Sequence, residues 1–233
     1  MFFCVMREER ILSKTNFLVL SCILATLLFW VASLSGVNVD GWVFSTDNLV
    51  QGRVWTLFTA LFLHADVLHL VGNMVFLYVF GNTLEKEVGG SKMLVAFFVG
   101  GVLAFLLGVP FFASSALILG ASGAVFALTA VVMLVKPLKF SFLFLMPVGL
   151  VAVIYFVYNV LAVLLGVESN VAYVSHLIGF VVGIAFGVRW GERVVRNVLI
   201  TVGLFVFYLF VVFFVVPYVF DLLGIQGIDL SPF

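Results

Sequence analysis

The chain has 233 residues, of which 65% are hydrophobic and 9% are charged, and its formal net charge is zero. A soluble domain is about half apolar and a quarter charged, so this composition excludes a soluble globular protein and indicates a lipid environment. The zero net charge and the absence of a basic run give no indication of nucleic-acid binding. Two cysteines, Cys4 and Cys22, suggest neither a disulfide framework nor a metal site.

Apolar stretches follow a short charged N-terminal segment. A transmembrane helix needs about 20 mostly apolar residues, and seven stretches qualify, at roughly 17–36, 67–84, 93–112, 121–135, 143–166, 171–190 and 197–219. The first is long enough to act as an anchor rather than a cleaved signal peptide. The linker 37–66 is too long for a tight turn, so we expect it to have structure of its own. The sequence therefore predicts an all-α polytopic membrane protein, with 1–233 as one membrane-embedded domain.

Lysine and arginine are distributed unevenly between the linkers. Placing the N-terminus in the cytoplasm leaves only Arg53 outside and puts ten basic residues inside: Arg7, Arg10, Lys14, Lys86, Lys92, Lys136, Lys139, Arg189, Arg193 and Arg196. Basic residues favour the cytoplasmic side. We therefore expect a cytoplasmic N-terminus, an external C-terminus and a location in the plasma membrane, with the second, fourth and sixth spans running inward.

Polar residues lie within these three inward spans. Asn73 lies 12 residues before Glu85, Ser122 lies 14 before Lys136, and His176 lies 13 before Arg189. At about 1.5 Å per helical residue, each lies roughly 18–21 Å above the cytoplasmic boundary. Polar groups inside a bilayer are costly and usually functional, so their shared depth predicts a site.

Each of these residues taken alone also has a simpler interpretation. A membrane serine usually bonds its own backbone, a buried histidine often only packs, and an asparagine can join two helices. The small residues around them favour a site. Gly123 and Ala127 form one face of the fourth span, and a second face on the sixth span contains His176, Gly179, Gly183 and Gly187. Such faces allow close helix packing in lipid, which would bring His176 toward Ser122.

The fourth span is short, since 15 residues give only about 22 Å of helix. Ser122 should therefore begin its helix below the membrane surface, and the segment 113–120 must dip inward to reach it. Such backbone is tolerated at this depth only inside protein or beside water. The free N–H groups of a helix start would then face the site, where they can stabilise an oxyanion.

Three motifs resemble those of the rhomboid family of intramembrane serine proteases. Gly120-Ala-Ser122-Gly123-(x)3-Ala127 resembles its nucleophile motif GxSGxxxA. The second-span motif is His64-(x)4-His69-(x)3-Asn73-Met74, and the sixth-span motif is Ser175-His176-Leu-Ile-Gly179. The resemblance runs from about Trp55 to Gly187 and implies a prokaryotic-type rhomboid-like six-helix bundle, with a core of about 17–190 and an additional span at about 197–219.

The resemblance implies a serine endopeptidase that cleaves single-span or polytopic membrane proteins in the lipid bilayer without a cofactor. Ser122 would be the nucleophile and His176 its base, without a third acid. The oxyanion site would combine the Ser122 N–H with His69 and Asn73. Glu85 would be structural, the fifth span and the loop near 166–170 would admit substrate, and the first outer loop would lie partly in the bilayer. Supporting positions would be Gly120, Gly123, Phe126, Gly179 and Gly183.

Some positions depart from the family pattern, and other functions remain open. Trp55 is followed by Thr56 where many members have arginine, and Phe126 stands where many have the tyrosine on which the histidine stacks. The main alternative is a catalytically inactive rhomboid-like protein that binds membrane clients. A transporter would show inverted repeats, which are not evident. A zinc protease would favour histidines at i and i+4, whereas His64 and His69 are five apart; we expect no metal.

Overall fold

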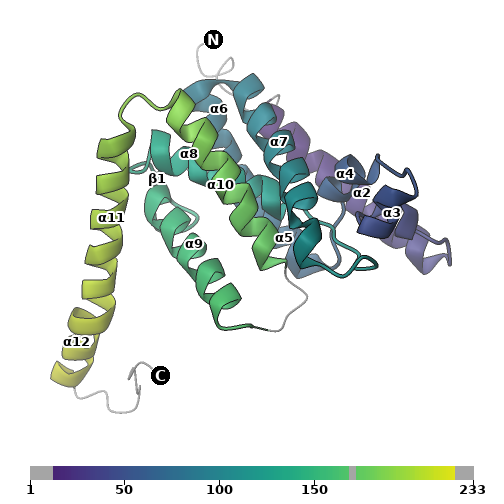
Figure 1. The fold of residues 1–233 in the computed structure, drawn as a ribbon. Coiled ribbons are helices and arrows are strands. Elements are labelled where there is room, and N and C mark those ends of the chain that lie inside the picture. Colours follow the sequence, from purple (N-terminus) through teal and green to yellow (C-terminus); the bar gives the residue numbers. More distant parts are fainter. Residues whose placement is uncertain (1–12, 168–171, 224–233) are drawn as a thin grey trace, which may run out of the picture.

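The computed structural model describes residues 13–167 and 172–223 of the chain, which are mainly helical (Figure 1). The longer helices are α2 (Lys14–Leu34), α5 (Val67–Phe76), α7 (Gly90–Gly108), α8 (Ser122–Val135), α9 (Val148–Leu164), α10 (Tyr173–Trp190) and α11 (Val194–Phe210). Two of them continue through π-helical turns, η3 (Leu77–Gly81) and η5 (Val211–Val215), into α6 (Asn82–Val88) and α12 (Val216–Leu222). Short elements occupy the linkers: η1 (Asp40–Trp42), α3 (Thr46–Val50), α4 (Thr56–Thr59), η2 (Ala60–Phe62), η4 (Val109–Phe111), β1 (Phe140–Ser141) and β2 (Met146–Pro147).

Five helical stretches are long and apolar enough to cross a membrane: 14–34, 67–88, 90–111, 173–190 and 194–220. Two apolar helices, α8 and α9, are shorter, with 14 and 17 residues. The prediction of an all-α polytopic membrane protein is confirmed. The residues Arg7 and Arg10, most of the loop 166–170 and the C-terminus lie outside the described residues.

The predicted start of the fifth span at residue 143 is wrong, because α9 begins at Val148. The preceding apolar residues form a tight hairpin in which Phe140 pairs with Pro147 and Ser141 pairs with Met146. Leu145 at the turn has φ +57°. Pro147 then precedes the helix as its N-cap residue, a position that tolerates the absence of a backbone N–H.

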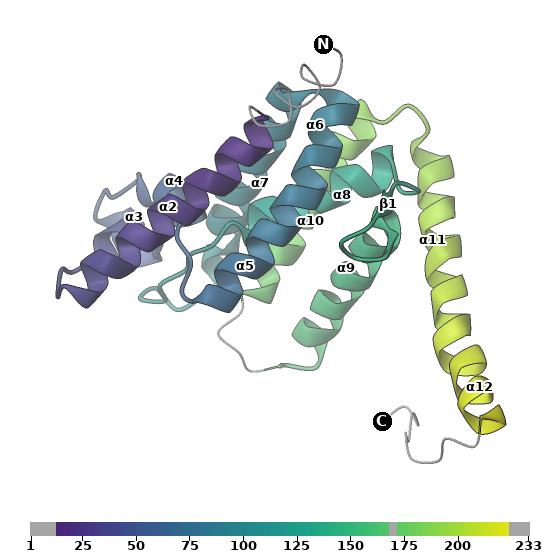
Figure 2. The same ribbon diagram turned by 180° about the vertical axis from the view of Figure 1, so that it is seen from behind.

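Helix α8 forms the centre of the bundle. It packs against α7 and α10 most extensively, and also against α9, η3 and α11. Every residue from 123 to 132 is buried, which agrees with a helix that is apolar on all sides. Figure 2 shows α2 and the continuous stretch from α5 to α6 on the opposite side of the bundle from the view of Figure 1. The helix that starts at Ser122 is therefore enclosed by protein rather than lipid.

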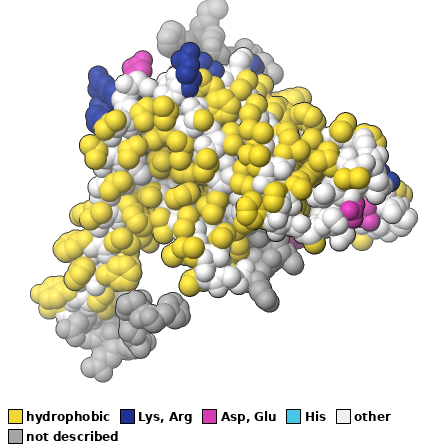
Figure 3. Space-filling view, in the orientation of Figure 1, with side chains coloured by type: hydrophobic (Ala, Val, Ile, Leu, Met, Phe, Trp, Pro, Cys, Tyr) yellow, Lys and Arg dark blue, Asp and Glu magenta, His cyan; other side chains and the backbone are white. Residues whose placement is uncertain are grey.

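Charged side chains gather at the end of the bundle where α6 ends and α11 begins (Figure 3). At this end the Glu85 carboxylate accepts hydrogen bonds from the backbone N–H groups of Lys14 and Thr15, at 2.9 Å each, and from the Thr15 hydroxyl at 2.7 Å. Lys139 donates to Thr83 Oγ1 at 2.7 Å. A carboxylate at a helix start satisfies free N–H groups and matches the helix dipole. Glu85 thus fixes the first turn of α2 to α6.

The linker between α2 and α5 is folded, in agreement with its length. Asn48 holds it together, because its Nδ2 donates to the carbonyls of Asp40 and Val43 and its Oδ1 accepts from Arg53. The linker lies on one side of the bundle in Figure 1. Large apolar side chains remain exposed there, including Trp42, Trp55 and Phe58. The neighbouring phenylalanine Phe44 is buried instead, and it pairs through its backbone with Ile118.

Candidate active site

The loop before α8 delivers Ser122 to the interior of the bundle. Gly120 has φ +123°, a left-handed conformation that glycine adopts without strain. A Cβ at this glycine would lie 2.7 Å from His69 Nε2 and 3.8 Å from Ser122 Oγ. The Gly120 N–H donates to the carbonyl of Ala60 at 2.9 Å. The glycine therefore leaves open the space that both side chains border, and Ser122 is the first residue of α8, as expected.

His64 holds the loop before α8 in place through hydrogen bonds. It is fully buried, and its Nδ1 lies 3.1 Å from the Thr26 hydroxyl. Its Nε2 accepts from the Ala121 N–H at 3.4 Å, and its carbonyl accepts from Trp30 at 2.8 Å. Since both ring nitrogens are occupied, His64 acts as a tie between α2 and the residue before Ser122 rather than as a ligand for an ion.

Glycines set the distance between α8 and α10. An ideal Cβ at Gly179 would overlap the carbonyl of Gly123, and one at Gly183 would overlap the carbonyl of Ala127. A Cβ on Gly123 would lie 2.6 Å from the Ala104 side chain of α7. The two small-residue faces that the sequence predicts therefore pack against each other, and they bring the helix that carries His176 against the helix that carries Ser122.

The His176 ring is buried and held on two sides. It stacks on Phe126 with the ring centroids 4.6 Å apart and the planes 11° apart. Tyr155 stacks on Phe126 as well, at 4.7 Å. His176 Nδ1 lies 2.8 Å from Oδ1 of Asn159, which comes from α9. Phenylalanine thus provides the stacking surface that the resemblance associates with tyrosine.

Asn159 is a site residue that the sequence analysis missed, although the signal was present. It is the one amide side chain in the apolar stretch 143–166. It lies 11 residues after Val148, where α9 begins, or about 16 Å along the helix. That depth is close to the depth of Ser122 and His176. Counting depth along the fifth predicted span, as was done for the second, fourth and sixth, would have identified it.

His69 and Asn73 face Ser122 from α5. Asp66 caps this helix by accepting the His69 N–H at 2.8 Å, and the Ala65 N–H approaches His69 Nδ1 at 3.4 Å. With Nδ1 as the acceptor, Nε2 carries the proton and points toward Gly120. Asn73 donates through Nδ2 to the His69 carbonyl of its own helix at 2.9 Å. One N–H of the Asn73 amide remains for another acceptor.

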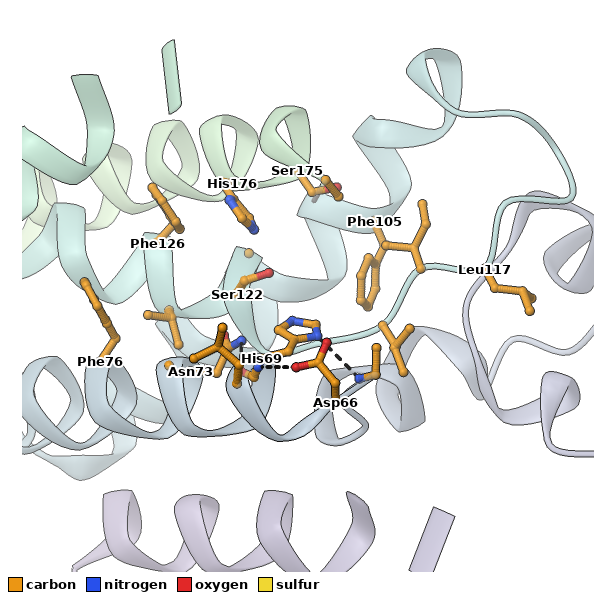
Figure 4. A pocket seen from close by; sticks show the side chains of 18 of the residues that line it. Asp66, His69, Asn73, Phe76, Phe105, Leu117, Ser122, Phe126, Ser175 and His176 are labelled. Atoms are coloured by element: carbon orange, nitrogen blue, oxygen red, sulfur yellow. Dashed lines mark hydrogen bonds between the residues drawn. The ribbon is translucent and has the colours of Figure 1, made fainter. Parts of the chain in front are cut away.

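The side chains of Ser122, His176, His69 and Asn73 line one cavity of about 780 Å³, which Ser175 and Phe76 also line. In Figure 4, Ser122 lies between His176 on one side and His69 and Asn73 on the other. In the described part of the chain, Ser122 Oγ makes no hydrogen bond, so the contact with His176 is not closed. Catalytic hydrogen bonds often tighten only when substrate binds.

No group of three or more His, Cys, Asp or Glu residues within 13–167 and 172–223 could hold a metal ion. Ser175, next to His176, donates to the Ala104 carbonyl at 3.3 Å and joins α10 to α7. The polar groups of the cavity are thus hydroxyl, imidazole and amide groups, with Asp66 engaged at the start of α5. This set suits proton transfer and hydrogen bonding to a carbonyl oxygen.

Comparison with known proteins places this arrangement in a family. A family model described as "Rhomboid domain" matches residues 51–193. The chain is 33% identical over 122 residues to Rhomboid-like protein 11, chloroplastic, of Arabidopsis thaliana, a match that covers 47% of this chain and 42% of that protein. It is 29% identical over 161 residues to RHOMBOID-like protein 12, mitochondrial, of the same plant, covering 60% and 48%. It is 27% identical over 137 residues to Rhomboid protease GlpG of Salmonella newport (strain SL254), covering 54% and 45%.

The matched segments span about half the length of these relatives. The family match itself extends from the folded linker through α10, and so includes every residue that lines the cavity. Over half of the chain lies within it. On this evidence the chain belongs to the rhomboid family.

Proposed function

We propose that this protein is an intramembrane serine endopeptidase in which Ser122 and His176 form a catalytic dyad. The observation that carries the proposal is the position of Ser122 at the first turn of the buried helix α8, in one cavity with His176, His69 and Asn73. The relative named Rhomboid protease GlpG, which shares the same family domain, supports the same reaction class.

In the proposed mechanism, Ser122 Oγ attacks the carbonyl carbon of the scissile peptide bond while His176 Nε2 accepts the hydroxyl proton. His176 then returns this proton to the leaving amine, and an acyl-enzyme on Ser122 remains. Water attacks the ester with the same histidine as base, and the carboxyl product leaves. The proton that His176 takes from this water returns to Ser122 Oγ, so apart from the leaving amine no group outside Ser122, His176 and water gains or loses a proton over the cycle.

The developing negative charge on the carbonyl oxygen needs hydrogen-bond donors. Three are available beside Ser122: its own backbone N–H at the start of α8, His69 Nε2–H and the second N–H of Asn73. The first-turn N–H groups of a helix have no partner within the helix and carry positive potential. Donors fixed before the reaction stabilise an oxyanion without reorganisation.

The substrates we propose are single-span or polytopic membrane proteins, because the cavity lies within a bundle surrounded by lipid. We propose the six-plus-one arrangement of spans of a prokaryotic-type rhomboid, in one domain, with α11 and its continuation as the seventh. The short helix α8 then crosses where protein encloses it. On the basis of the lysine and arginine distribution, the N-terminus is cytoplasmic and the C-terminus is external. We propose the plasma membrane as the location.

The test uses the purified protein in liposomes with single-span model substrates and mass mapping of the cut site. Ser122→Ala and His176→Ala should each abolish cleavage, and the double variant should lose no more than either single variant, because the two residues act as a unit. A fluorophosphonate should label the wild type at Ser122. Substantial cleavage by a folded Ser122→Ala protein would reject the dyad. A folded wild type that neither cleaves nor labels would indicate a client-binding relative instead.

A further inference from the structure

We propose that Asn159 is a positioning residue that holds His176 in the one tautomer able to act as a base toward Ser122. The inference deepens the proposed function and rests on it. It is carried by a single buried contact, in which Asn159 Oδ1 lies 2.8 Å from His176 Nδ1. Only 1% of Asn159 and 5% of His176 is exposed, so the contact between them is buried.

The second bond of the asparagine fixes which end of its amide faces the histidine. Asn159 Nδ2 lies 2.8 Å from the carbonyl of Tyr155, one turn earlier in α9. A carbonyl oxygen can only accept a hydrogen bond, so the amide nitrogen must occupy that position. The amide oxygen is thereby turned toward His176, and it too can only accept.

The orientation of the amide determines the protonation of the ring. Because Asn159 Oδ1 accepts, His176 Nδ1 must carry the hydrogen. In a neutral imidazole the other nitrogen is then bare, and Nε2 keeps the lone pair that a general base needs. With the opposite tautomer, two acceptors would face each other in a buried site, which is unfavourable. The chain thus uses a neutral amide where many serine hydrolases use a carboxylate.

The surroundings of the ring contain few other groups that could set its protonation. Tyr173 of α10 lies edge-on to the ring, Tyr155 of α9 stacks on the same Phe126 as the ring does, and His69 and Asp66 also line the cavity. The residues that α7 and α8 contribute to the cavity are uncharged: Phe105, Ser122, Gly123, Val125 and Phe126. Among the described residues, the only side-chain hydrogen bond of His176 is the one to Asn159.

Three variants separate this role from simple packing of α9 against α10. Asn159→Leu keeps the branched shape and the number of heavy atoms and removes the acceptor. Asn159→Asp keeps an acceptor and adds a negative charge. Asn197→Leu is the matched control, since Asn197 is also buried and also joins two helices, through bonds from its Nδ2 to the carbonyls of Leu134 and Val135. It does not line the cavity.

The first measurement is the rate of fluorophosphonate labelling at Ser122 as a function of pH, in phosphatidylcholine liposomes. Asn159→Leu should label about ten- to a hundredfold more slowly, because much of the general-base contribution is lost. Asn159→Asp should recover most of that rate, and the acidic limb of its profile should move to higher pH by about one unit, because a carboxylate favours the charged imidazolium. Asn197→Leu should keep the wild-type pH profile even where its stability falls.

The second measurement reads the tautomer directly and does not require activity. Nitrogen-15 NMR of histidine-labelled protein, assigned by comparison with His176→Gln, should show a protonated Nδ1 and a bare Nε2 in the wild type. Asn159→Leu should shift the population toward a protonated Nε2. If the fluorophosphonate does not label the wild-type protein but His176 still carries its proton on Nδ1, the proposed function fails and the positioning role of Asn159 stands.

Two results would overturn the proposal. One is a protonated Nε2 in the neutral wild-type ring. The other is a folded Asn159→Leu protein with wild-type labelling rate and pH profile. If Asn159→Leu fails to fold, the Asn159→Asp variant provides the test. An acidic limb of its labelling profile at the same pH as in the wild type would then reject the role of Asn159.

Discussion

Gly183 in α10 lies directly against the backbone carbonyl of Ala127 in α8, with no space for a side chain between them. One turn nearer to His176, Gly179 meets the carbonyl of Gly123 in the same way. Because these are backbone groups, they cannot move aside as a flexible side chain would. The absence of a Cβ at Gly179 and at Gly183 therefore sets the separation of α8 and α10. It also determines how closely His176 approaches Ser122.

Gly183→Val should lower activity without removing any group that takes part in the proposed reaction. The added carbons would push α10 away from α8, and a displacement of about 1 Å at a reacting centre can cost about a hundredfold in rate. Gly203→Val is the control, because nothing lies within 4 Å of a Cβ at Gly203 in α11. The measurement is kcat/KM for a model substrate. Equal activity of the two variants would show that the helix spacing has no bearing on catalysis.

Asn73→Ala should lower kcat by about a hundred- to a thousandfold and leave KM nearly unchanged, as expected for an oxyanion donor. The Asn73 side chain donates to its own helix, so its loss should cost little stability. Asn82→Ala removes the same kind of bond, to the carbonyl of Tyr78 four residues earlier, and should leave turnover intact. A destabilised Asn73→Ala protein with normal turnover would assign Asn73 to packing alone.

Alanine substitutions at His64 and His69 should have different effects, the first mainly on stability and the second mainly on turnover. His64→Ala leaves the Ala121 N–H without its acceptor in a buried position, which costs about 1–3 kcal/mol of the free energy of unfolding. His69→Ala removes a partly exposed side chain of the cavity and should mainly lower kcat. Unfolding in graded denaturant and turnover on the same preparations test this. A His64→Ala protein as stable as the wild type would show that the hydrogen bond between His64 and the Ala121 N–H does not contribute to the free energy of unfolding.

Glu85→Gln should destabilise the start of α2 by about 1–2 kcal/mol, because an amide cannot accept all three bonds and turns an NH₂ group toward donors. Glu87→Gln serves as the control. Its partner Lys136 lies at 3.3 Å, but the two side chains are 29% and 53% exposed, and such surface pairs contribute about 0–1 kcal/mol. If both variants unfold at the same denaturant concentration, Glu85 does not hold α2.

The membrane orientation can be tested with reporter fusions. A fusion at Lys139 should report the cytoplasm and one after Phe233 should report the outside, because the basic residues favour one side of the membrane. In the described part of the chain these residues gather at one end of the bundle (Figure 3). Both reporters on one side would remove a span from the proposed arrangement.

The fold class and most of the cavity could be predicted from the sequence, because a bilayer imposes strong rules on length, hydropathy and polar residues. Depth along the second, fourth and sixth predicted spans was sufficient to group Ser122, His176 and Asn73. Hydropathy could not separate the apolar hairpin 140–147 from the helix that follows, because the hairpin is rich in phenylalanine and leucine and the helix is rich in valine and leucine, so both are strongly apolar.

Contacts between helices were harder to predict than depths within them. The bond between Asn159 and His176 depends on how α9 is rotated, and the bond between His64 and the Ala121 N–H depends on the path of an irregular loop. Neither rotation nor loop path follows from periodicity. The stacking of His176 on Phe126, by contrast, was expected from the family resemblance, which associates an aromatic residue at this position with the histidine.

Helix α11 has a consequence for shortened versions of this protein. Most of α11 and its continuation stands apart from the bundle (Figure 1). Its deletion would therefore remove few contacts with the rest of the protein. Near its start, however, Asn197 donates to the last carbonyls of α8, those of Leu134 and Val135. A chain cut before Val194 would leave the C-terminal end of the serine-bearing helix without that partner. A cut that retains the first two turns of α11 would preserve it.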